Sequence, residues 1–293
     1  MSDAAVTPGS TYPPVPEPIG VPVYDNHTHL NLFMGDDQLG PAAQLGKATE
    51  AGVVGVIQVG VDLETSRVSA ALAAEHANVL AAVAIHPNAA PELVLAGKLD
   101  ETMAEIEALA RQPRVAVIGE TGLDFYRTEG DENIAAQTRS FEAHLELAKQ
   151  LGMPLQIHDR NAHDAVVETL LRVGAPEKTV FHCFSGDTDL VEICAKHGWY
   201  MSFAGNVTFK NAQDLRDALA VAPRELVLVE TDAPFLTPAP WRGRPNSPYL
   251  IQHTLKVMAE VAGEDLESYA EQIAANTLAV YGPWDAAPTG AAA

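Results

Sequence analysis

The chain has 293 residues, a formal net charge of −21, 47% hydrophobic residues and two cysteines. This length suits one domain with a full core and is too short for a second sizeable domain, and two cysteines argue against a disulfide framework. No uninterrupted apolar stretch is long enough to cross a bilayer, and no broad basic surface for general DNA binding is expected.

The two ends of the chain differ in composition from its middle. Residues 1–20 contain five prolines and few large apolar groups, which predicts a flexible leader. This leader lacks the cationic start and the apolar stretch of a signal peptide, so we expect a cytoplasmic protein. We expect a single domain over residues 21–282 and a flexible tail over residues 283–293, with a monomer as the default state.

Eight short apolar runs alternate with helical segments along the chain. The runs are continuously hydrophobic, which is typical of parallel strands covered on both faces. They span residues 21–24, 53–59, 79–85, 115–118, 154–157, 179–181, 199–203 and 226–229. Apolar residues at spacings of three and four predict helices between them, most clearly over residues 65–77, 101–111, 134–151, 162–173, 189–197 and 212–221.

Eight strands that are each followed by a helical stretch predict an α/β fold of the (β/α)8, or TIM, barrel type. An open doubly wound sheet is the alternative, and it would need a glycine-rich phosphate loop after the first strand. The segment found there is His27-Thr28-His29-Leu30. In such barrels the chemistry lies at the carboxyl ends of the strands, which is where we look for a site.

Two histidines mark the end of the first predicted strand, in Asp25-Asn26-His27-Thr28-His29. On an extended chain the side chains at positions i and i+2 point the same way, so His27 and His29 can converge on one cation. A pair this short also occurs by chance, so it needs support from other residues.

That support comes from polar residues at the ends of four other apolar runs, namely Glu120, His158, His182 and Asp232. Four imidazoles and two carboxylates suffice for two divalent ions. We expect His27, His29 and Asp232 to hold one ion and His158 and His182 to hold the other. Glu120, at the end of the fourth strand, is placed to bridge them. The alternative to a metal site is that these are six unrelated polar residues at strand ends that bind no ion.

Two cations about 3.5–4 Å apart acidify a bound water and stabilise the attacking and leaving oxygens in displacement at phosphorus. Hydrolysis is therefore the predicted reaction class, and the fold is interpreted as a barrel of the metal-dependent hydrolase type. Asp232 is the predicted general base, and the general acid is unassigned. Imidazole-rich sites favour Zn²⁺ or Mn²⁺, so the identity of the two ions is open.

The remaining histidines and the cysteines have other predicted roles. His86, in Ile85-His86-Pro87, faces the same end of the barrel and is expected to contact the substrate. Five histidines fall within or at the ends of helical segments and are set aside as structural, namely His76, His144, His163, His197 and His253. Cys183 is expected to pack in the core because it follows His182 on the strand and points the opposite way, so no catalytic thiol is predicted.

Five motifs in this order resemble the successive signatures of the TatD-type metal-dependent deoxyribonucleases, which belong to the amidohydrolase-like barrels. The motifs are Asp25-Asn26-His27-Thr28-His29-Leu30, Ile118-Gly119-Glu120-Thr121-Gly122-Leu123-Asp124-Phe125-Tyr126, Ile157-His158-Asp159-Arg160, His182-Cys183-Phe184-Ser185-Gly186 and Glu230-Thr231-Asp232-Ala233-Pro234-Phe235-Leu236. The resemblance runs from Asp25 to about Gly282. It implies 3'-5' exonuclease action on DNA with magnesium, in DNA repair or fragment clearance, and it assigns ligand roles to the same six residues.

Three positions depart from the family pattern. Asn88 stands where the family usually has a second histidine after His86-Pro87, and Asn246-Ser247-Pro248 replaces the usual Asn-Glu-Pro. Near the carboxyl end the family's asparagine is kept as Asn276, but the arginine that should accompany it is missing. Because none of these positions is a predicted ligand, they bear on substrate preference and not on hydrolysis.

The net charge of −21 opposes a nucleic-acid substrate at long range. Local cations can outweigh it, and those in the loops above the predicted metals are Arg127, Arg160, Lys210, Arg242 and Arg244. We expect Arg160, Arg242 and Arg244 to contact the substrate. The predicted partner is a DNA end or single-stranded DNA, bound weakly, with salt sensitivity and without sequence specificity.

Aromatic residues in the same loops, Phe125, Tyr126, Phe209 and Trp241, can either stack on an unpaired base or pack against the barrel rim. Two other functions stay open. The barrel can hydrolyse another ester or amide, for instance a D-aminoacyl-tRNA, or it can bind metal without catalysing a reaction. Retention of every ligand type argues against the second of these.

Overall fold

The computed structural model describes residues 11–33 and 38–284. Eight parallel strands form one sheet in the order of the sequence, from β1 to β8. They are β1 (Val23–Thr28), β2 (Val53–Val59), β3 (Val79–Val83), β4 (Val115–Asp124), β5 (Leu155–Arg160), β6 (Thr179–Phe181), β7 (Tyr200–Phe203) and β8 (Val227–Val229). The predicted (β/α)8 barrel is confirmed.

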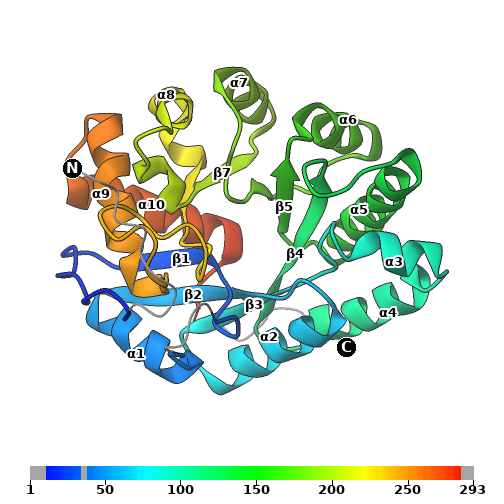
Figure 1. Cartoon of the computed structure of the whole chain (residues 1–293), viewed down its shortest axis with the longest axis horizontal. Helices are drawn as coiled ribbons and strands as arrows, with labels where there is room; N and C mark the ends of the chain where they lie inside the picture. The colour runs from blue at the N-terminus through cyan, green and yellow to red at the C-terminus, as the bar shows by residue number, and fades with distance from the viewer. Residues whose placement is uncertain (1–10, 34–37, 285–293) are drawn as a thin grey trace.

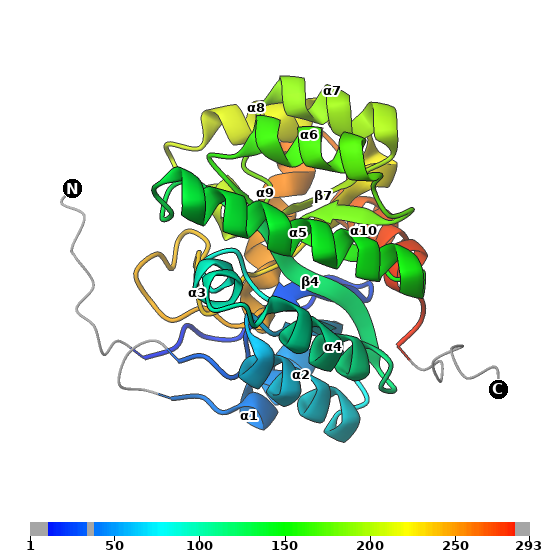
Figure 2. The ribbon, with the colours of Figure 1, turned by 90° about the vertical axis from the view of Figure 1, so that its right-hand side faces the viewer.

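Helices surround the strands as an outer ring (Figure 1). They are α1 (Pro41–Glu50), α2 (Leu63–Glu75), α3 (Ala90–Leu95), α4 (Leu99–Ala110), α5 (Asp131–Leu151), α6 (His163–Val173), α7 (Thr188–His197), α8 (Gln213–Val221), α9 (Ile251–Ala262) and α10 (Leu266–Tyr281), with short 3-10 helices η1 (Gly205–Thr208), η2 (Arg224–Leu226) and η3 (Pro248–Leu250). Figure 2 shows α4 and α5 on the outside of β4. None of the helices in the described residues is both long and apolar enough to span a membrane.

The seam between β1 and β8 closes the barrel with few backbone contacts. Thr28 and Ala233 form an isolated parallel bridge, and the His29 N–H donates to the Ala233 carbonyl (2.7 Å). The buried Asp25 carboxylate adds to this by accepting hydrogen bonds from the Thr231 N–H (2.8 Å) and hydroxyl (2.5 Å). A side chain therefore completes the closure, right beside the predicted histidine pair.

Each strand buries apolar side chains on both faces, as a parallel sheet between layers requires. On β3, Val79 and Ala81 belong to the main core between sheet and helices. Leu80 and Ala82 alternate with them and join a second apolar cluster, with Ile57 of β2 and residues of β4, β6 and β8. This second cluster fills the barrel interior and contains Val280, Tyr281 and Trp284 from the end of the chain.

All eight predicted strands are present, and three of them extend past their predicted ends. β1 reaches Thr28, β4 reaches Asp124 and β5 reaches Arg160, so polar residues that were expected to follow these strands lie within them. They stay in the strand because they are buried or half-buried and face the end of the barrel. The six most clearly predicted helices are also found. The other four helices of the described residues are α1, α3, α9 and α10, of which α9 and α10 lie beyond the eighth strand, where the predicted alternation of strands and helices had ended.

The described part of the predicted leader lies against the barrel. Residues 11–20 have no regular secondary structure, yet Pro13 and Ile19 are buried. The Tyr249 hydroxyl donates a hydrogen bond to the Pro13 carbonyl (2.7 Å). This stretch is packed instead of flexible, because its apolar groups find a surface beside η3. Residues 1–10 lie outside the described residues.

The barrel also extends beyond its predicted end at residue 282. Trp284, which was assigned to the tail, is buried, and its ring centroid lies 4.7 Å from that of Tyr24 on β1. The backbone carbonyl of Trp284 accepts a hydrogen bond from Arg114 Nη1 (2.9 Å). The remaining tail, residues 285–293, lies outside the described part of the chain.

His144 on α5 is a structural histidine, as predicted. It is fully buried, its Nε2 accepts the Ile85 N–H (3.0 Å), and its Nδ1 donates to the Ser140 carbonyl (2.7 Å). Burial lowers the pKa of His144 to about 4, against the smaller opposing effect of the Ser140 hydrogen bond. Its neutral ring thus anchors the chain directly before His86.

We predict that this histidine makes stability depend on pH. Because the folded-state pKa is depressed from 6.5 to about 4, the unfolded chain binds more protons between these values. The contribution of neutral His144 to the free energy of unfolding is complete above pH 6.5 and is lost as the pH falls toward 4. Relative to His144→Gln, the metal-free wild type should lose about 2–3 kcal/mol of unfolding free energy between pH 7 and pH 4.5, measured by urea unfolding in EDTA. The same pH response in both proteins would contradict this, and His197→Gln, an exposed site on α7, is the control.

Candidate metal centre

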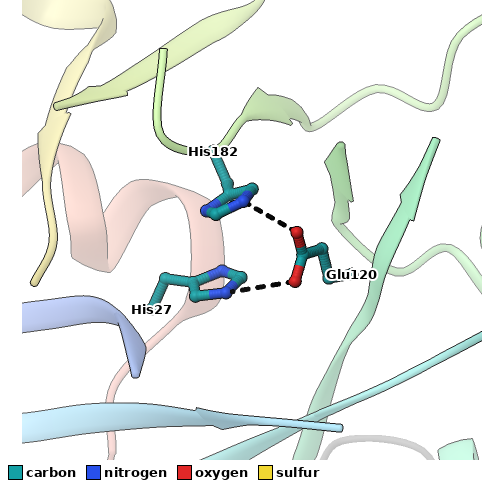
Figure 3. A group of neighbouring side chains, drawn as sticks. All are labelled: His27, Glu120 and His182. Carbon is teal, nitrogen blue, oxygen red and sulfur yellow. Dashed lines mark ion pairs between the residues drawn. The ribbon is translucent and has the colours of Figure 1, made fainter. Parts of the chain in front are cut away.

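The six predicted ligands lie together at the carboxyl end of the barrel. They lie within strands or shortly after them: His27 in β1, His29 just beyond it, Glu120 in the middle of β4, His158 in β5, His182 after β6 and Asp232 after β8. Figure 3 shows His27, Glu120 and His182 pointing toward one another. His158 and Asp232 are partly exposed and the other four are buried. Residues up to about 200 positions apart in the sequence thus meet at one point.

Glu120 lies at the centre of this group, and its two carboxylate oxygens face different histidines. Oε1 lies 2.7 Å from His158 Nδ1 and 2.9 Å from His182 Nε2. Oε2 lies 3.6 Å from His27 Nε2. One carboxylate therefore stands between the two sets of histidines, which is the position expected of a bridging ligand.

Asp232 belongs to the set on the Oε2 side of Glu120. Its Oδ1 lies 3.5 Å from His29 Nε2 and 3.8 Å from His27 Nε2. The Asp232 N–H donates to the His27 carbonyl (2.9 Å), which ties the aspartate backbone to β1 across the seam of the barrel. The geometry that closes the barrel also brings this carboxylate to the histidine pair.

The local sequence of β4 explains how Glu120 reaches this position. The pairing of β4 with β5 is irregular between Ile118 and Thr121, so the chain does not follow a regular pleat there. A Cβ added at Gly122 would lie 2.1 Å from the His158 carbonyl oxygen, and Gly122 has a φ of +143°. Only glycine allows this close approach of the two strands, which places Glu120 beside His158.

Three of the histidines hydrogen-bond through Nδ1 to a fixed acceptor. The pairs are His27 with Gln156 Oε1 (3.1 Å), His29 with the Val59 carbonyl (3.1 Å) and His182 with Glu230 Oε1 (2.9 Å). In the neutral form of each ring Nδ1 carries the proton, so the Nε2 lone pair points to the centre of the site. Imidazoles held in this way are prepared to bind a metal.

The orientation of the Gln156 amide supports this assignment for His27. Gln156 Nε2 donates to the Asn26 carbonyl (2.7 Å) and to the Tyr281 hydroxyl (2.9 Å). Its Oε1 therefore has to face the histidine, and it can only accept. His27 must donate through Nδ1, which leaves Nε2 free.

Donor atoms in the described residues form three overlapping groups in which all atoms lie within 4.8 Å of one another. These groups are His27 with Glu120 and His182, His27 with His29 and Asp232, and His86 with Glu120 and His158. Neutral imidazole and carboxylate together suit Zn²⁺ and Mn²⁺, whereas Mg²⁺ prefers oxygen and keeps waters. The donor set therefore fits divalent cations.

The electrostatics of the site favour positive charge. Burial acts to raise the pKa of Glu120, but the neighbouring His182 and His86 hold it well below its usual range. Burial acts to lower the pKa of His182, yet the carboxylates of Glu120 and Glu230 on either side raise it well above 6.5. Carboxylates in a water-poor pocket thus create a place for a cation.

A cavity of about 740 Å³ opens above these donors. His86 and Arg160, two of the predicted substrate contacts, line it. Arg242 and Arg244 lie outside its lining and stack instead on Phe209 (3.9 Å) and Trp241 (5.5 Å), measured from the guanidinium carbon to the ring centroid. Only part of the predicted substrate surface therefore faces the metal centre directly.

His86 differs from the other histidines in its tautomer. Its Nδ1 accepts a hydrogen bond from the Asn88 N–H (3.0 Å), so a neutral ring carries its proton on Nε2. Nε2 faces Glu120 Oε1 at 3.4 Å, and burial lowers the pKa of His86. His86 thus presents an N–H donor to the centre and not a lone pair.

Two buried carboxylates beside the ligands were missed. Asp124 Oδ2 lies 3.3 Å from His158 Nε2, and Glu230 accepts from His182 Nδ1 and from the Cys183 N–H (2.8 Å). Both carboxylates orient an imidazole that belongs to the site. The signal was present, because Glu230 directly follows the apolar run of β8 and Asp124 lies in the same motif as Glu120.

The predicted place of Cys183 in the core is wrong. β6 ends at Phe181, so the alternation of a strand does not continue to Cys183, which has a φ of +43°. It is half-buried and lines the cavity. Cys194 is buried in α7, and neither cysteine forms a disulfide, as expected.

Two of the departures from the family pattern have different surroundings. Asn88 lines the cavity and donates through Nδ2 to Asp124 Oδ2 (3.3 Å). Ser247 is fully buried, and its hydroxyl donates to Gln44 Oε1 on α1 (3.3 Å). Of these two, only Asn88 can influence the choice of substrate by contact.

A (β/α)8 barrel that gathers histidines and carboxylates at the carboxyl ends of its strands is the architecture of a metal-dependent hydrolase. A family model described as TatD related DNase matches residues 24–282. The chain belongs to this family.

The relatives of the chain agree with this assignment. A protein of Mycobacterium tuberculosis, described as an uncharacterized metal-dependent hydrolase TatD, is 39% identical over 261 residues, which cover 88% of this chain and 97% of the relative. The 3'-5' ssDNA/RNA exonuclease TatD of Erwinia amylovora is 34% identical over 244 residues, covering 80% and 91%. The solved structure of a TatD homolog from Escherichia coli K12 matches with a TM-score of 0.79 and 28% identity, covering 89% of this chain and 98% of that one.

We predict that Glu230 supports metal binding through His182 although it does not face the cation. Glu230→Leu removes the acceptor of the His182 Nδ1 proton and should weaken the binding of Mn²⁺ about 10- to 100-fold in calorimetric titration. Glu230→Gln keeps an acceptor oxygen and should lose less. Glu225→Gln, an exposed acidic site in η2, is the control. Wild-type affinity in folded Glu230→Leu protein would refute this role.

Proposed function

We propose that the chain is a nuclease that uses two divalent ions to hydrolyse phosphodiester bonds at the ends of single-stranded DNA, in the 3'-5' direction. The observation that carries the proposal is Glu120, whose two oxygens face separate sets of imidazoles. The Erwinia amylovora relative, named a 3'-5' ssDNA/RNA exonuclease, supports the choice of substrate. Action in the cytoplasm and as a monomer is part of the proposal and keeps the expectations drawn from the sequence, whereas a role in DNA repair or fragment clearance rests on the resemblance to the family.

The residues of the site suggest separate roles in this reaction. Divalent ions held by the six ligands would acidify a bound water and neutralise charge on the phosphate. Asp232 is partly exposed to the cavity and can accept the proton of the attacking water. His86 can donate its Nε2 proton in a hydrogen bond to a phosphate oxygen, because its Nδ1 is occupied by the Asn88 N–H. This is the substrate contact predicted for His86.

The acidic surface limits binding but does not prevent it. A net charge of −21 slows the approach of a polyanion, and at the cavity only Arg127 and Arg160 supply fixed positive charge within the described residues. An enzyme that acts on a strand end needs few phosphate contacts. Affinity should accordingly be low, and its dependence on salt shallow compared with proteins that bind duplex DNA.

The direct test is incubation of purified protein with 5'-end-labelled single-stranded DNA and Mg²⁺, Mn²⁺ or Zn²⁺. We predict progressive shortening with release of mononucleotides, and a loss of at least about 100-fold in rate for Asp232→Asn, because a ligand and proton acceptor is removed. Asp214→Asn, at an exposed site on α8, should keep wild-type activity. Intact DNA together with hydrolysis of an aminoacyl ester would favour the alternative substrate class.

The two-ion arrangement is tested separately by stoichiometry. His158→Ala or His182→Ala should reduce the number of tightly bound Mn²⁺ ions from two to one, because each removes an imidazole from the Oε1 side of Glu120. Titration followed by electron paramagnetic resonance counts the bound ions, and circular dichroism confirms the fold. His197→Ala, exposed at the end of α7, is the matched control. Unchanged stoichiometry in both variants would refute the assignment.

A further inference from the structure

Two arginines at the cavity are without carboxylate partners in a chain that has 39 acidic and 18 basic residues. Five arginines on the outer surface do form ion pairs, namely Arg67, Arg111, Arg139, Arg172 and Arg224. Six other arginines of the described residues form no ion pair. Of these, Arg114 and Arg216 donate to backbone carbonyls, and Arg242 and Arg244 stack on aromatic rings outside the cavity. Only Arg127 and Arg160 line the cavity. Since carboxylates are abundant, unpaired guanidinium groups at this place indicate an anionic ligand.

The two arginines are held on one side of the cavity. The guanidinium carbon of Arg160 lies 4.0 Å from the ring centroid of Tyr126, which is 61% exposed. Asp124 accepts the backbone N–H groups of Tyr126 (3.0 Å) and Arg127 (2.8 Å) through Oδ1, which fixes the loop after β4. We call Arg127 and Arg160 the cationic wall.

Apolar side chains form another part of the lining. Leu32 follows β1, Val61 follows β2, and Phe235 and Leu236 follow β8. Phe235 is 43% exposed, and its ring centroid lies 6.2 Å from that of His29. A phenylalanine this exposed, beside a cluster of charged groups, has a free face for an apolar ligand. We call these four residues the apolar wall.

The order of the strands places the two walls across the cavity from each other. The sheet runs from β1 to β8 and closes between β8 and β1, so β8, β1 and β2 are neighbours. β4 and β5, which precede the cationic wall, lie on the other side of the barrel. Glu120 and the histidines around it lie between the walls, at the floor of the cavity.

We propose that the cavity binds the terminal nucleotide of a single strand with its base against the apolar wall and an adjoining phosphate on the cationic wall. This inference rests on the proposed function and specifies its substrate, a strand end with an unpaired base. A base stacks on an aromatic face without regard to sequence, and a guanidinium binds phosphate with two hydrogen bonds. The scissile phosphodiester then lies over Glu120. A base engaged in a duplex cannot present its face to Phe235.

The cationic wall is tested with two substrates, a single-stranded oligonucleotide and bis(4-nitrophenyl) phosphate, a small diester without a second phosphate. Arg160→Ala and Arg127→Ala should each lower kcat/KM for the oligonucleotide, mainly through KM, and at least about fivefold more than for the small diester. Arg172→Ala, which removes the same charge from the outer face of α6, is the control. Equal losses on both substrates would overturn the role of this wall.

The apolar wall is tested by removing the terminal base from the substrate. Wild-type protein should cleave an oligonucleotide with an abasic 3' terminus about tenfold more slowly than the intact one, as expected for the loss of one stacking contact. Phe235→Ala should cleave the intact and the abasic oligonucleotide at similar rates. The control Val221→Ala, at an exposed apolar site on α8, should keep the wild-type ratio of the two rates. Undiminished discrimination by Phe235→Ala would overturn the inference and leave the nuclease proposal standing. Hydrolysis of the small diester with no cleavage of either oligonucleotide would defeat both.

Discussion

The structure depends on one buried carboxylate. Glu120 is 4% exposed, and an isolated charge in such a place would cost several kcal/mol. His158 and His182 contact one oxygen and His27 approaches the other, so positive or polarised groups surround the charge on both sides. Because the pairing of β4 is irregular and Gly122 allows β5 to approach closely, the Glu120 side chain points into the centre of the site. In the proposed two-ion site, a cation on either side of Glu120 would complete the same compensation.

The imidazoles are held by residues from separate strands. Gln156 on β5 orients His27 of β1, and the Val59 carbonyl of β2 orients His29. The ring of His182 is oriented by Glu230, which follows β8. The orientation of each of these imidazoles therefore depends on a residue that is distant in sequence. A small separation of two strands would turn its Nε2 away from the centre of the site. The Asp25–Thr231 hydrogen bonds across the seam matter for this reason as much as for the fold.

The barrel and the six clustered residues were predictable because both arise from local patterns. Apolar runs show buried strands, and a polar residue that ends each run shows which end of the barrel faces solvent. Contacts between distant segments were not predictable in this way. Asp124 and Glu230 serve histidines on other strands, and the packing of Trp284 against Tyr24 closes the barrel from beyond its predicted end. The place of Cys183 was missed because strand alternation was extended past Phe181, where β6 ends.

The balance of charge explains how an acidic protein can belong to a family of nucleases. Surface carboxylates pair with the outer arginines, which removes those cations from competition for a substrate. At the cavity the carboxylates Glu120, Asp124 and Asp232 face histidines, so their negative charge is directed inward. Arg127 and Arg160 line the same cavity without an ion-pair partner among the described residues. For the proposed strand-end substrate, the attraction of a near guanidinium at short range would exceed the screened repulsion of distant helices. The net charge would then lower the rate at which such a strand approaches, and the two cavity arginines would determine whether its end binds.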